Sequence, residues 1–259
     1  MALWLLITVA MMIFIGVSFI KDDINIGSHT LSKAYYPETL MASKEEDDII
    51  IPTDTLEVIP DSLLNVPEIV PDTTVHKLLL FGDSMTHKLA MSIAKYGTKN
   101  NYKVTGVTWE SSSIPGWSSS GKIKAYLDSI KPDFIIVSLG ANEMGLRNFD
   151  KRKEDVKKIV DQIGQRPFIW VGPPLWKDDP GVYTMLEKAL PPGVLFKTDT
   201  GIEIPRGPDH IHPTTKGAQI WADTIMKWIK HSPHPILAEK PDSGTSTKGH
   251  KFIYLHPGD

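Results

Sequence analysis

Short apolar runs alternate with longer amphipathic stretches between residues 77 and 229. A short apolar run favours a strand, and apolar residues spaced three and four apart favour a helix. We expect strands at 77–81, 102–108, 134–139, 167–171 and 194–197, and helices at 85–95, 118–129, 150–163, 183–190 and 213–229. Strands that alternate with helices in this way form a parallel sheet that helices cover on both faces. The pattern therefore predicts an α/β fold.

Polar or flexible residues follow two of the expected strands. Ser84 comes after the first strand, and Gly140 and Asn142 come after the third. In an open parallel sheet, ligands bind outside the carboxyl ends of the strands. All three residues are therefore expected at the one edge of the sheet where a site would form.

Two short motifs supply the parts of a serine-type acyl-transfer site. Gly82-Asp83-Ser84 offers a hydroxyl nucleophile at a turn into a helix, where free N–H groups favour negative charge. Asp209 and His212 are three residues apart before the last helix, so the carboxylate can orient the imidazole as a base. Two alternatives remain open. Gly-Asp-Ser also occurs as an ordinary helix cap, and His210 is a rival base.

Several other side chains have two interpretations each. Asn142 can donate its amide to a developing oxyanion, or it can stabilise a turn. A metal site at Asp209, His210 and His212 would need further ligands, and none has a suitable spacing. His87 is expected on a helix surface. Three tryptophans near expected loop edges are either core residues or a wall for sugar stacking: Trp117, Trp170 and Trp176.

Three segments resemble, in this order, the first, third and fifth sequence blocks of the SGNH (GDSL-type) hydrolase family: Leu78 to Ser84, Val137 to Glu143 and Asp209 to Thr214. Glu143 stands where that pattern more often has Asp. The resemblance spans about residues 77 to 230. It implies a flavodoxin-like three-layer α/β/α sandwich with a mostly parallel five-stranded sheet.

The resemblance also implies a role for each matching residue. Ser84 would be the nucleophile, His212 the base and Asp209 the residue that orients the base. The oxyanion hole would take one donor from each of three residues: Ser84, Gly116 and Asn142. Gly116 is the better second-block glycine because it precedes an expected helix, and Gly106 is the alternative. The Gly-x-Ser-x-Gly elbow of α/β-hydrolases is absent from the chain.

The flanking segments differ in composition from this domain. Met1 to Ile20 is apolar and uncharged, so we expect a transmembrane signal anchor, with a cleaved signal peptide as the alternative. Residues 21–75 are expected to form an acidic, proline-punctuated linker, because between residues 21 and 76 acidic residues outnumber lysines by 12 to 3. We place the catalytic domain at 76–233 and a flexible C-terminal tail at 234–259.

These features predict a membrane-anchored esterase with an extracytoplasmic catalytic domain, or a secreted one after signal cleavage. It would remove small acyl groups, acetyl foremost, from carbohydrate, without a cofactor or a metal. The alternatives are an O-acetyltransferase acting on cell-envelope glycan and a non-catalytic glycan-binding module. The chain has no cysteine, which excludes a thiol nucleophile and disulfides. It has no basic cluster interleaved with aromatic residues, so we expect no nucleic-acid partner.

Overall fold

The computed structural model describes residues 24–26, 29–31, 70–198 and 201–259. From residue 70 onward the chain forms β3 (Lys77–Gly82), α2 (Thr86–Lys99), β4 (Lys103–Trp109), α3 (Ile114–Ser119), α4 (Lys122–Ile130), β5 (Phe134–Ser138), the short 3-10 helix η2 (Ala141–Glu143), α5 (Asp150–Ile163), β6 (Phe168–Val171), α6 (Val182–Ala189), β7 (Leu195–Phe196), α7 (Thr215–Ile229) and β8 (Lys251–Leu255). This alternation confirms the predicted α/β fold, with all five expected strands present.

These strands form one sheet in the order β7-β6-β5-β3-β4-β8, and each neighbouring pair in it is parallel. Apart from β8, this is the flavodoxin-like order. The chain runs from β3 outward to β4 and then returns to β5 on the other side of β3. The crevice at such a reversal is where doubly wound sheets bind ligands. Residues that follow β3 and β5 therefore lie where a site is expected.

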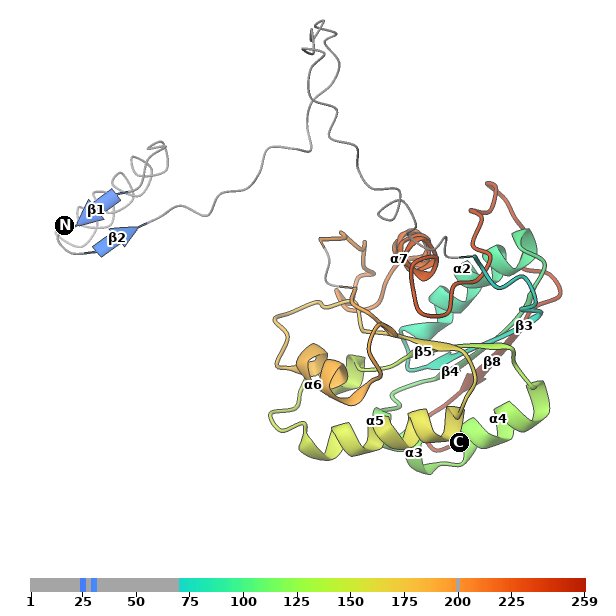
Figure 1. Ribbon diagram of the computed structural model, residues 1–259, viewed down its shortest axis with the longest axis horizontal. Coiled ribbons are helices and arrows are strands. Elements are labelled where there is room, and N and C mark those ends of the chain that lie inside the picture. The colour runs from blue at the N-terminus through green and yellow to red at the C-terminus, as the bar shows by residue number, and fades with distance from the viewer. Residues whose placement is uncertain (1–23, 27–28, 32–69, 199–200) are drawn as a thin grey trace, which may run out of the picture. The chain divides into compact units, whose positions relative to one another are not determined.

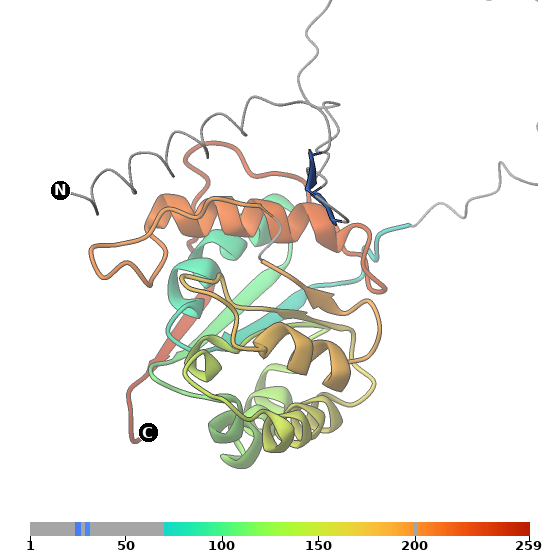
Figure 2. The same cartoon turned by 90° about the vertical axis from the view of Figure 1, so that its left-hand side faces the viewer.

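Helices cover both faces of the sheet and give the domain three layers, as Figures 1 and 2 show. Successive side chains of β3 point to opposite faces. Leu78 and Leu80 are buried in one core with residues of α2 and α7, whereas Leu79 and Phe81 are buried in a second core with residues of α3 to α6. The central strand is apolar throughout because both of its faces are covered.

Several helices differ from their predicted limits, and α2 extends beyond its predicted end to Lys99. The helix expected at 118–129 is interrupted, because Gly121 between α3 and α4 has a left-handed backbone with φ +74°. The last helix begins at Thr215 instead of Pro213. Thr214 caps it, and its hydroxyl oxygen accepts a hydrogen bond from the Gly217 N–H at 3.0 Å.

The C-terminal segment 234–259 is part of the fold, so the prediction of a flexible tail is wrong. β8 pairs with β4 from Thr105–Lys251 to Trp109–Leu255 and adds a sixth strand to the five predicted. Ahead of β8, Ile236 and Ala238 are buried in the core with α2 and α7. The Pro-, Ser-, Gly- and Lys-rich residues between are a connection, and their composition concealed the short strand that follows.

The predicted membrane anchor, Met1 to Ile20, and most of the predicted linker lie outside the described residues. Within the linker segment, β1 (Ile24–Ile26) and β2 (His29–Leu31) pair in antiparallel fashion. The chain divides into an N-terminal unit up to Leu63 and the unit that contains the six-stranded sheet. Among the described residues, no helix has the length and apolar character needed to cross a membrane.

Candidate active site

The turn after β3 carries Ser84 and is held in place by its neighbours. A Cβ on Gly82 would lie 1.9 Å from the Ser138 carbonyl oxygen of β5, so this close approach requires glycine. Asp83 is buried, and its carboxylate accepts a hydrogen bond from the Ala141 N–H at 3.3 Å. This bond joins the turn of Ser84 to the segment that follows β5.

The buried carboxyl group of Asp83 has an unusual protonation equilibrium. Burial raises its pKa to about 7, although the N–H groups of Met85, Ala141 and Gly140 favour the ionised form. One carboxylate oxygen accepts from Met85 at 3.0 Å and the other from Ala141. Both oxygens are thus engaged with the backbone, and Asp83 serves to position the turn.

His212 lies in a short loop that its own hydrogen bonds close. The Gly207 N–H donates to the His212 carbonyl at 2.8 Å. Asp209 Oδ1 accepts from the N–H groups of Ile211 and His212, both at 3.0 Å. An aspartate that binds the backbone a few residues ahead stabilises a turn. The Asp-x-x-His spacing therefore builds the loop in addition to pairing the two side chains.

Ser84, His212 and Asp209 form a continuous chain of hydrogen bonds. Asp209 Oδ2 lies 2.7 Å from His212 Nδ1, and His212 Nε2 lies 2.9 Å from Ser84 Oγ. A carboxylate only accepts hydrogen bonds, so Nδ1 carries the imidazole proton and Nε2 can accept from the serine hydroxyl. The structure thus brings together, from two distant parts of the chain, the three side chains that the motifs singled out.

The carboxylate of this trio is ionised, and the trio is open to solvent. The Ile211 N–H, followed by the imidazole and N–H of His212, holds the pKa of Asp209 well below its usual range. The side chains of His212 and Asp209 are 41% and 50% exposed. Water can therefore reach the imidazole from the open side of the site.

The loop that carries the imidazole is braced by two cationic side chains. Arg206 donates hydrogen bonds to the Ile211 carbonyl and, at 2.7 Å, to the Leu175 carbonyl in the segment after β6. Lys88 of α2 donates to the Pro213 carbonyl at 3.0 Å. These bonds tie the loop to the ends of two other elements of the fold. The sequence does not reveal the role of either residue, because a lone cation in a loop or on a helix is an ordinary surface feature.

Asn142 follows β5, and its amide is oriented by a single hydrogen bond. Nδ2 donates to the Ser112 carbonyl at 2.7 Å. An amide nitrogen has two hydrogens, so one remains for another acceptor. The side chain is exposed, at the same edge of the sheet as Ser84. A fixed donor with one free hydrogen has the properties that oxyanion stabilisation requires.

The two glycines predicted for the oxyanion hole have different surroundings. Gly106 lies within β4, paired with Leu80 on one side and Phe252 on the other. Its backbone belongs to the interior of the sheet, away from the carboxyl ends, which argues against it as a donor. Gly116 lies in the first turn of α3, where a Cβ would meet the ring of Trp109 at 3.6 Å.

The loop after β4 offers a third source of an oxyanion donor. It contains Ser112, whose carbonyl accepts from Asn142, and Ser111, whose φ is +56°. A left-handed backbone is uncommon for residues other than glycine and marks a constrained turn. Nothing in the sequence signals this conformation at a serine, whereas the family resemblance implies a glycine as the donor.

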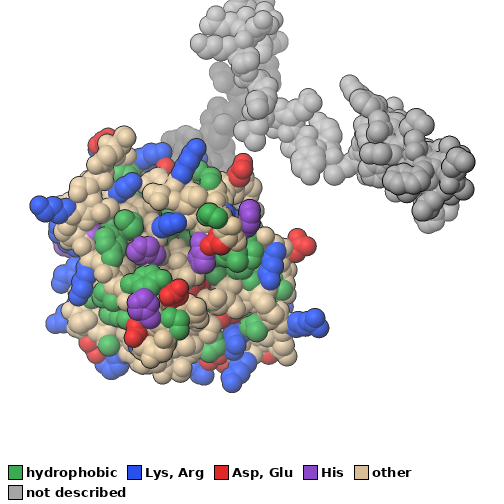
Figure 3. Space-filling model, turned by 180° about the vertical axis from the view of Figure 1, so that it is seen from behind, with side chains coloured by type: hydrophobic (Ala, Val, Ile, Leu, Met, Phe, Trp, Pro, Cys, Tyr) green, Lys and Arg blue, Asp and Glu red, His purple; other side chains and the backbone are tan. Residues whose placement is uncertain are grey.

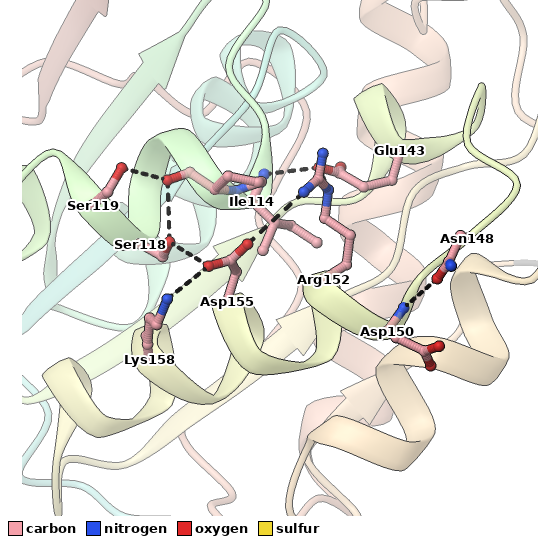
Figure 4. A network of polar contacts seen from close by, with 10 residues as sticks. Ile114, Ser118, Ser119, Glu143, Asn148, Asp150, Arg152, Asp155 and Lys158 are labelled. Carbon is pink, nitrogen blue, oxygen red and sulfur yellow. Dashed lines mark hydrogen bonds and ion pairs between the residues drawn. The ribbon is translucent and has the colours of Figure 1, made fainter.

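A buried polar network supports this loop, and Figure 4 shows its side chains. Glu143 Oε1 accepts from the Ile114 N–H at 2.9 Å. Arg152 of α5 lies 4.0 Å from Glu143 and 3.8 Å from Asp155. Burial raises the pKa of Glu143, while the Ile114 N–H and the Arg152 charge oppose that rise. Through Asn142 and Glu143, consecutive residues after β5 hold the loop at two points.

Of the described histidines, His212 is the one that forms a hydrogen bond with the Ser84 hydroxyl. His210 is exposed with φ +58°, and in the described part of the chain no hydrogen bond involves its side chain. His87 is exposed on α2, as predicted. The described residues contain no cluster of three His, Cys, Asp or Glu side chains suited to a metal ion.

The three tryptophans are mainly core residues. Trp117 and Trp170 are fully buried, and their indole N–H groups donate to the Ser112 hydroxyl at 2.9 Å and to the Leu139 carbonyl at 3.0 Å. Trp176 is half-buried and packs against both cores. Neither buried tryptophan can offer a ring face to a sugar.

Comparison with known proteins identifies no close relative. No family model and no curated protein matches this chain. The structure of an acetyl xylan esterase superposes with a TM-score of 0.47 and 14% identity, over 58% of this chain and 98% of that one. A gut microbial diltiazem-metabolizing enzyme superposes with a TM-score of 0.39 and 11% identity, over 62% of this chain and 48% of that one.

Proposed function

We propose that this protein is a serine esterase of the SGNH type that removes small acyl groups, acetyl foremost, from carbohydrate. One observation carries the proposal: the unbroken hydrogen-bonded chain from Ser84 through His212 to Asp209. A hydroxyl, an imidazole and a carboxylate in this order activate the hydroxyl as a nucleophile. The order of the three sequence blocks and the flavodoxin-like order of β3 to β7 both support the family assignment.

In the first half of the reaction, Ser84 Oγ attacks the carbonyl carbon of the ester while His212 Nε2 takes its proton. Asp209 stabilises the imidazolium that forms and keeps Nδ1 protonated. When the tetrahedral intermediate collapses, the bond to the alcohol oxygen breaks and Nε2 returns the proton to that oxygen. The acyl group remains on Ser84.

The negative charge on the intermediate's oxygen needs donors that are already in place. The free hydrogen of the Asn142 amide is the first donor, and the Ser84 N–H in the turn before α2 is the second. The loop after β4, held by Asn142 and Glu143, supplies the third, either from the N–H of Ser111 or from Gly116. The N–H groups of Glu110 and Ser112 are excluded, because they donate to the Leu255 and Trp109 carbonyls.

In the second half, water attacks the acyl-enzyme and His212 again serves as the base. The exposure of His212 and Asp209 favours water as the acceptor over a second glycan, which would need a site that excludes water. This observation favours the esterase over the O-acetyltransferase. Hydrolysis releases the free acid and restores the Ser84 hydroxyl.

Release of the acyl product tests the proposal. The protein should hydrolyse 4-nitrophenyl acetate and release acetate from acetylated oligosaccharides, whereas Ser84→Ala should do neither. A fluorophosphonate probe should label the wild type and leave Ser84→Ala unlabelled. A folded wild type that neither hydrolyses these esters nor reacts with the probe would instead be the non-catalytic glycan-binding module.

The proposal includes a location outside the cytoplasm, supported by the apolar segment 1–20 and the acidic segment after it. Protease added to intact spheroplasts should remove the domain that contains Ser84. Full protection of the domain while the membrane is intact would contradict this location.

A further inference from the structure

Four polar and aromatic side chains stand together beside the turn of Ser84. The ring of His87, from the first turn of α2, meets the ring of Tyr254 edge-on at 5.6 Å. The ring of Tyr254 in turn meets that of His256 at 5.2 Å. Glu110 lies 3.6 Å from His256 Nδ1, and burial together with the Glu110 charge raises the pKa of Tyr254. We call this group the β8 platform: His87, Glu110, Tyr254 and His256.

The register of the sheet explains why the β8 platform lies near the candidate active site. Thr108 of β4 pairs with Gly82 on one side and with Tyr254 on the other. Neighbouring strands are about 4.8 Å apart, so Tyr254 stands about 10 Å from Gly82 across the sheet. His256 follows the last residue of β8, and its ring lies 5.2 Å from the ring of Tyr254, so the two side chains lie together. In the β8 platform, His87 thus lies about one helical turn after Ser84, and the other three residues lie farther from Ser84 across the sheet.

The chemistry of the β8 platform suits a sugar better than a peptide. Tyr254 is 43% exposed, and the side chains of His256 and Glu110 are 71% and 41% exposed. Figure 3 shows a face on which histidine, hydrophobic and acidic side chains lie together. The C–H face of a sugar can pack on an aromatic ring, while its hydroxyls bind carboxylate and imidazole groups. An apolar peptide would leave the Glu110 carboxylate desolvated and without a partner.

The side chain of Tyr254 is also ordered before a ligand binds. It lies between the rings of His87 and His256, with ring centroids 5.6 Å and 5.2 Å away and both pairs in T-shaped arrangements. A side chain that is already fixed loses little entropy when a ligand packs on it. These two ring contacts order the side chain while it remains 43% exposed.

We infer that the β8 platform is a carbohydrate subsite that binds a sugar ring of the substrate while the ester group of that substrate lies at Ser84. The inference rests on the proposed esterase function and specifies which surface recognises the glycan. The spacing of about 10 Å suits a contact with the esterified sugar or with its neighbour in an oligosaccharide. The C-terminal strand, which adds the sixth strand to the sheet, therefore supplies substrate recognition.

Two kinds of substrate distinguish an effect on carbohydrate binding from an effect on the acyl-transfer reaction. Tyr254→Ala and His87→Ala are compared with the wild-type full chain on 4-nitrophenyl acetate and on chemically acetylated xylo-, cello- and chito-tetraose. Loss of a ring contact should lower kcat/KM on the best tetrasaccharide roughly 3- to 10-fold, mainly through KM, and leave 4-nitrophenyl acetate within about 2-fold. Tyr254→Phe is the matched control, because it keeps the ring and should retain most of the tetrasaccharide activity.

The outcomes distinguish this inference from the proposed function. If Tyr254→Ala and the wild type hydrolyse every tetrasaccharide equally well, or if the variant loses activity equally on both kinds of substrate, the subsite is wrong although the esterase stands. A wild type that hydrolyses 4-nitrophenyl acetate and no acetylated tetrasaccharide also overturns the subsite. If the wild type hydrolyses no ester and its Ser84 does not react with a fluorophosphonate, the proposed function fails and the subsite fails with it.

Discussion

Replacing Asp209 by Asn separates the two tasks that this side chain performs. The amide oxygen of Asn can still accept from the Ile211 and His212 N–H groups, both at 3.0 Å, so the loop should keep its shape. The amide NH2 would replace Oδ2, which lies 2.7 Å from His212 Nδ1. Two donors would then face each other. The imidazole should respond by moving its proton to Nε2, which leaves Nδ1 as an acceptor.

The wrong tautomer removes general-base catalysis. With a hydrogen on Nε2, the imidazole can no longer accept the Ser84 proton across the 2.9 Å contact. We expect kcat on 4-nitrophenyl acetate to fall about 10³- to 10⁴-fold, as when the carboxylate of another triad is made an amide. Both the burst of acylation and the steady state should slow, because His212 acts as the base in both steps.

Two further variants complete this test. Asp209→Ala should lose the loop-closing acceptor as well, and its melting temperature should fall below that of Asp209→Asn. Asp72 accepts from the Thr74 N–H at 2.7 Å in a similar local turn, so Asp72→Asn is the matched control and should leave kcat unchanged. If Asp209→Asn keeps its fold and retains kcat within 10-fold of the wild type, Asp209 only stabilises the loop and the reasoning about the tautomer is refuted.

Three more predictions concern the surroundings of Ser84. Asn142→Ala should lower kcat roughly 10²- to 10³-fold, about 3–4 kcal/mol, with KM little changed; an unchanged kcat would exclude Asn142 as an oxyanion donor. Glu143→Ala should leave the Ile114 N–H buried without an acceptor and cost about 1–3 kcal/mol in urea unfolding, whereas Glu143→Gln keeps an acceptor and should be milder. Because the pKa of Asp83 is raised, the folded state binds more protons than the unfolded state between pH 3.8 and about 7, so the unfolding free energy should decline as pH rises through this window. Asp83→Asn should lack that decline, and equal slopes for the two proteins would contradict it.

The elements of the sheet could be predicted because their signals are local. The apolar runs that became β3 to β7 each lie between amphipathic stretches, and the Gly-Asp-Ser and Asp-x-x-His motifs each specify a turn by their own side chains. Once the parallel order is inferred, the strand ends must meet at one edge. The proximity of Ser84 and Asn142 followed from that geometry.

The features that were missed depend on partners far away in the sequence. β8 follows a polar connection and pairs with β4, more than 140 residues earlier, and no local pattern reveals such a pairing. The left-handed backbone of Ser111 and the bond from Ile114 to Glu143 arise from how the loop after β4 meets the end of β5. A short strand in a polar segment and a carboxylate beside a turn are ordinary features until the fold brings their partners to them.

The acyl-enzyme itself tests the central claim most directly. Protein mixed with 4-nitrophenyl acetate and quenched in acid within the burst phase should gain the mass of one acetyl group, and peptide mapping should locate that group on Ser84. His212→Ala should accumulate it far more slowly, and Ser84→Ala should not accumulate it at all. An acetyl group found on another residue of the folded wild type, or equal acetylation of Ser84→Ala, would contradict the assignment of Ser84 as the nucleophile.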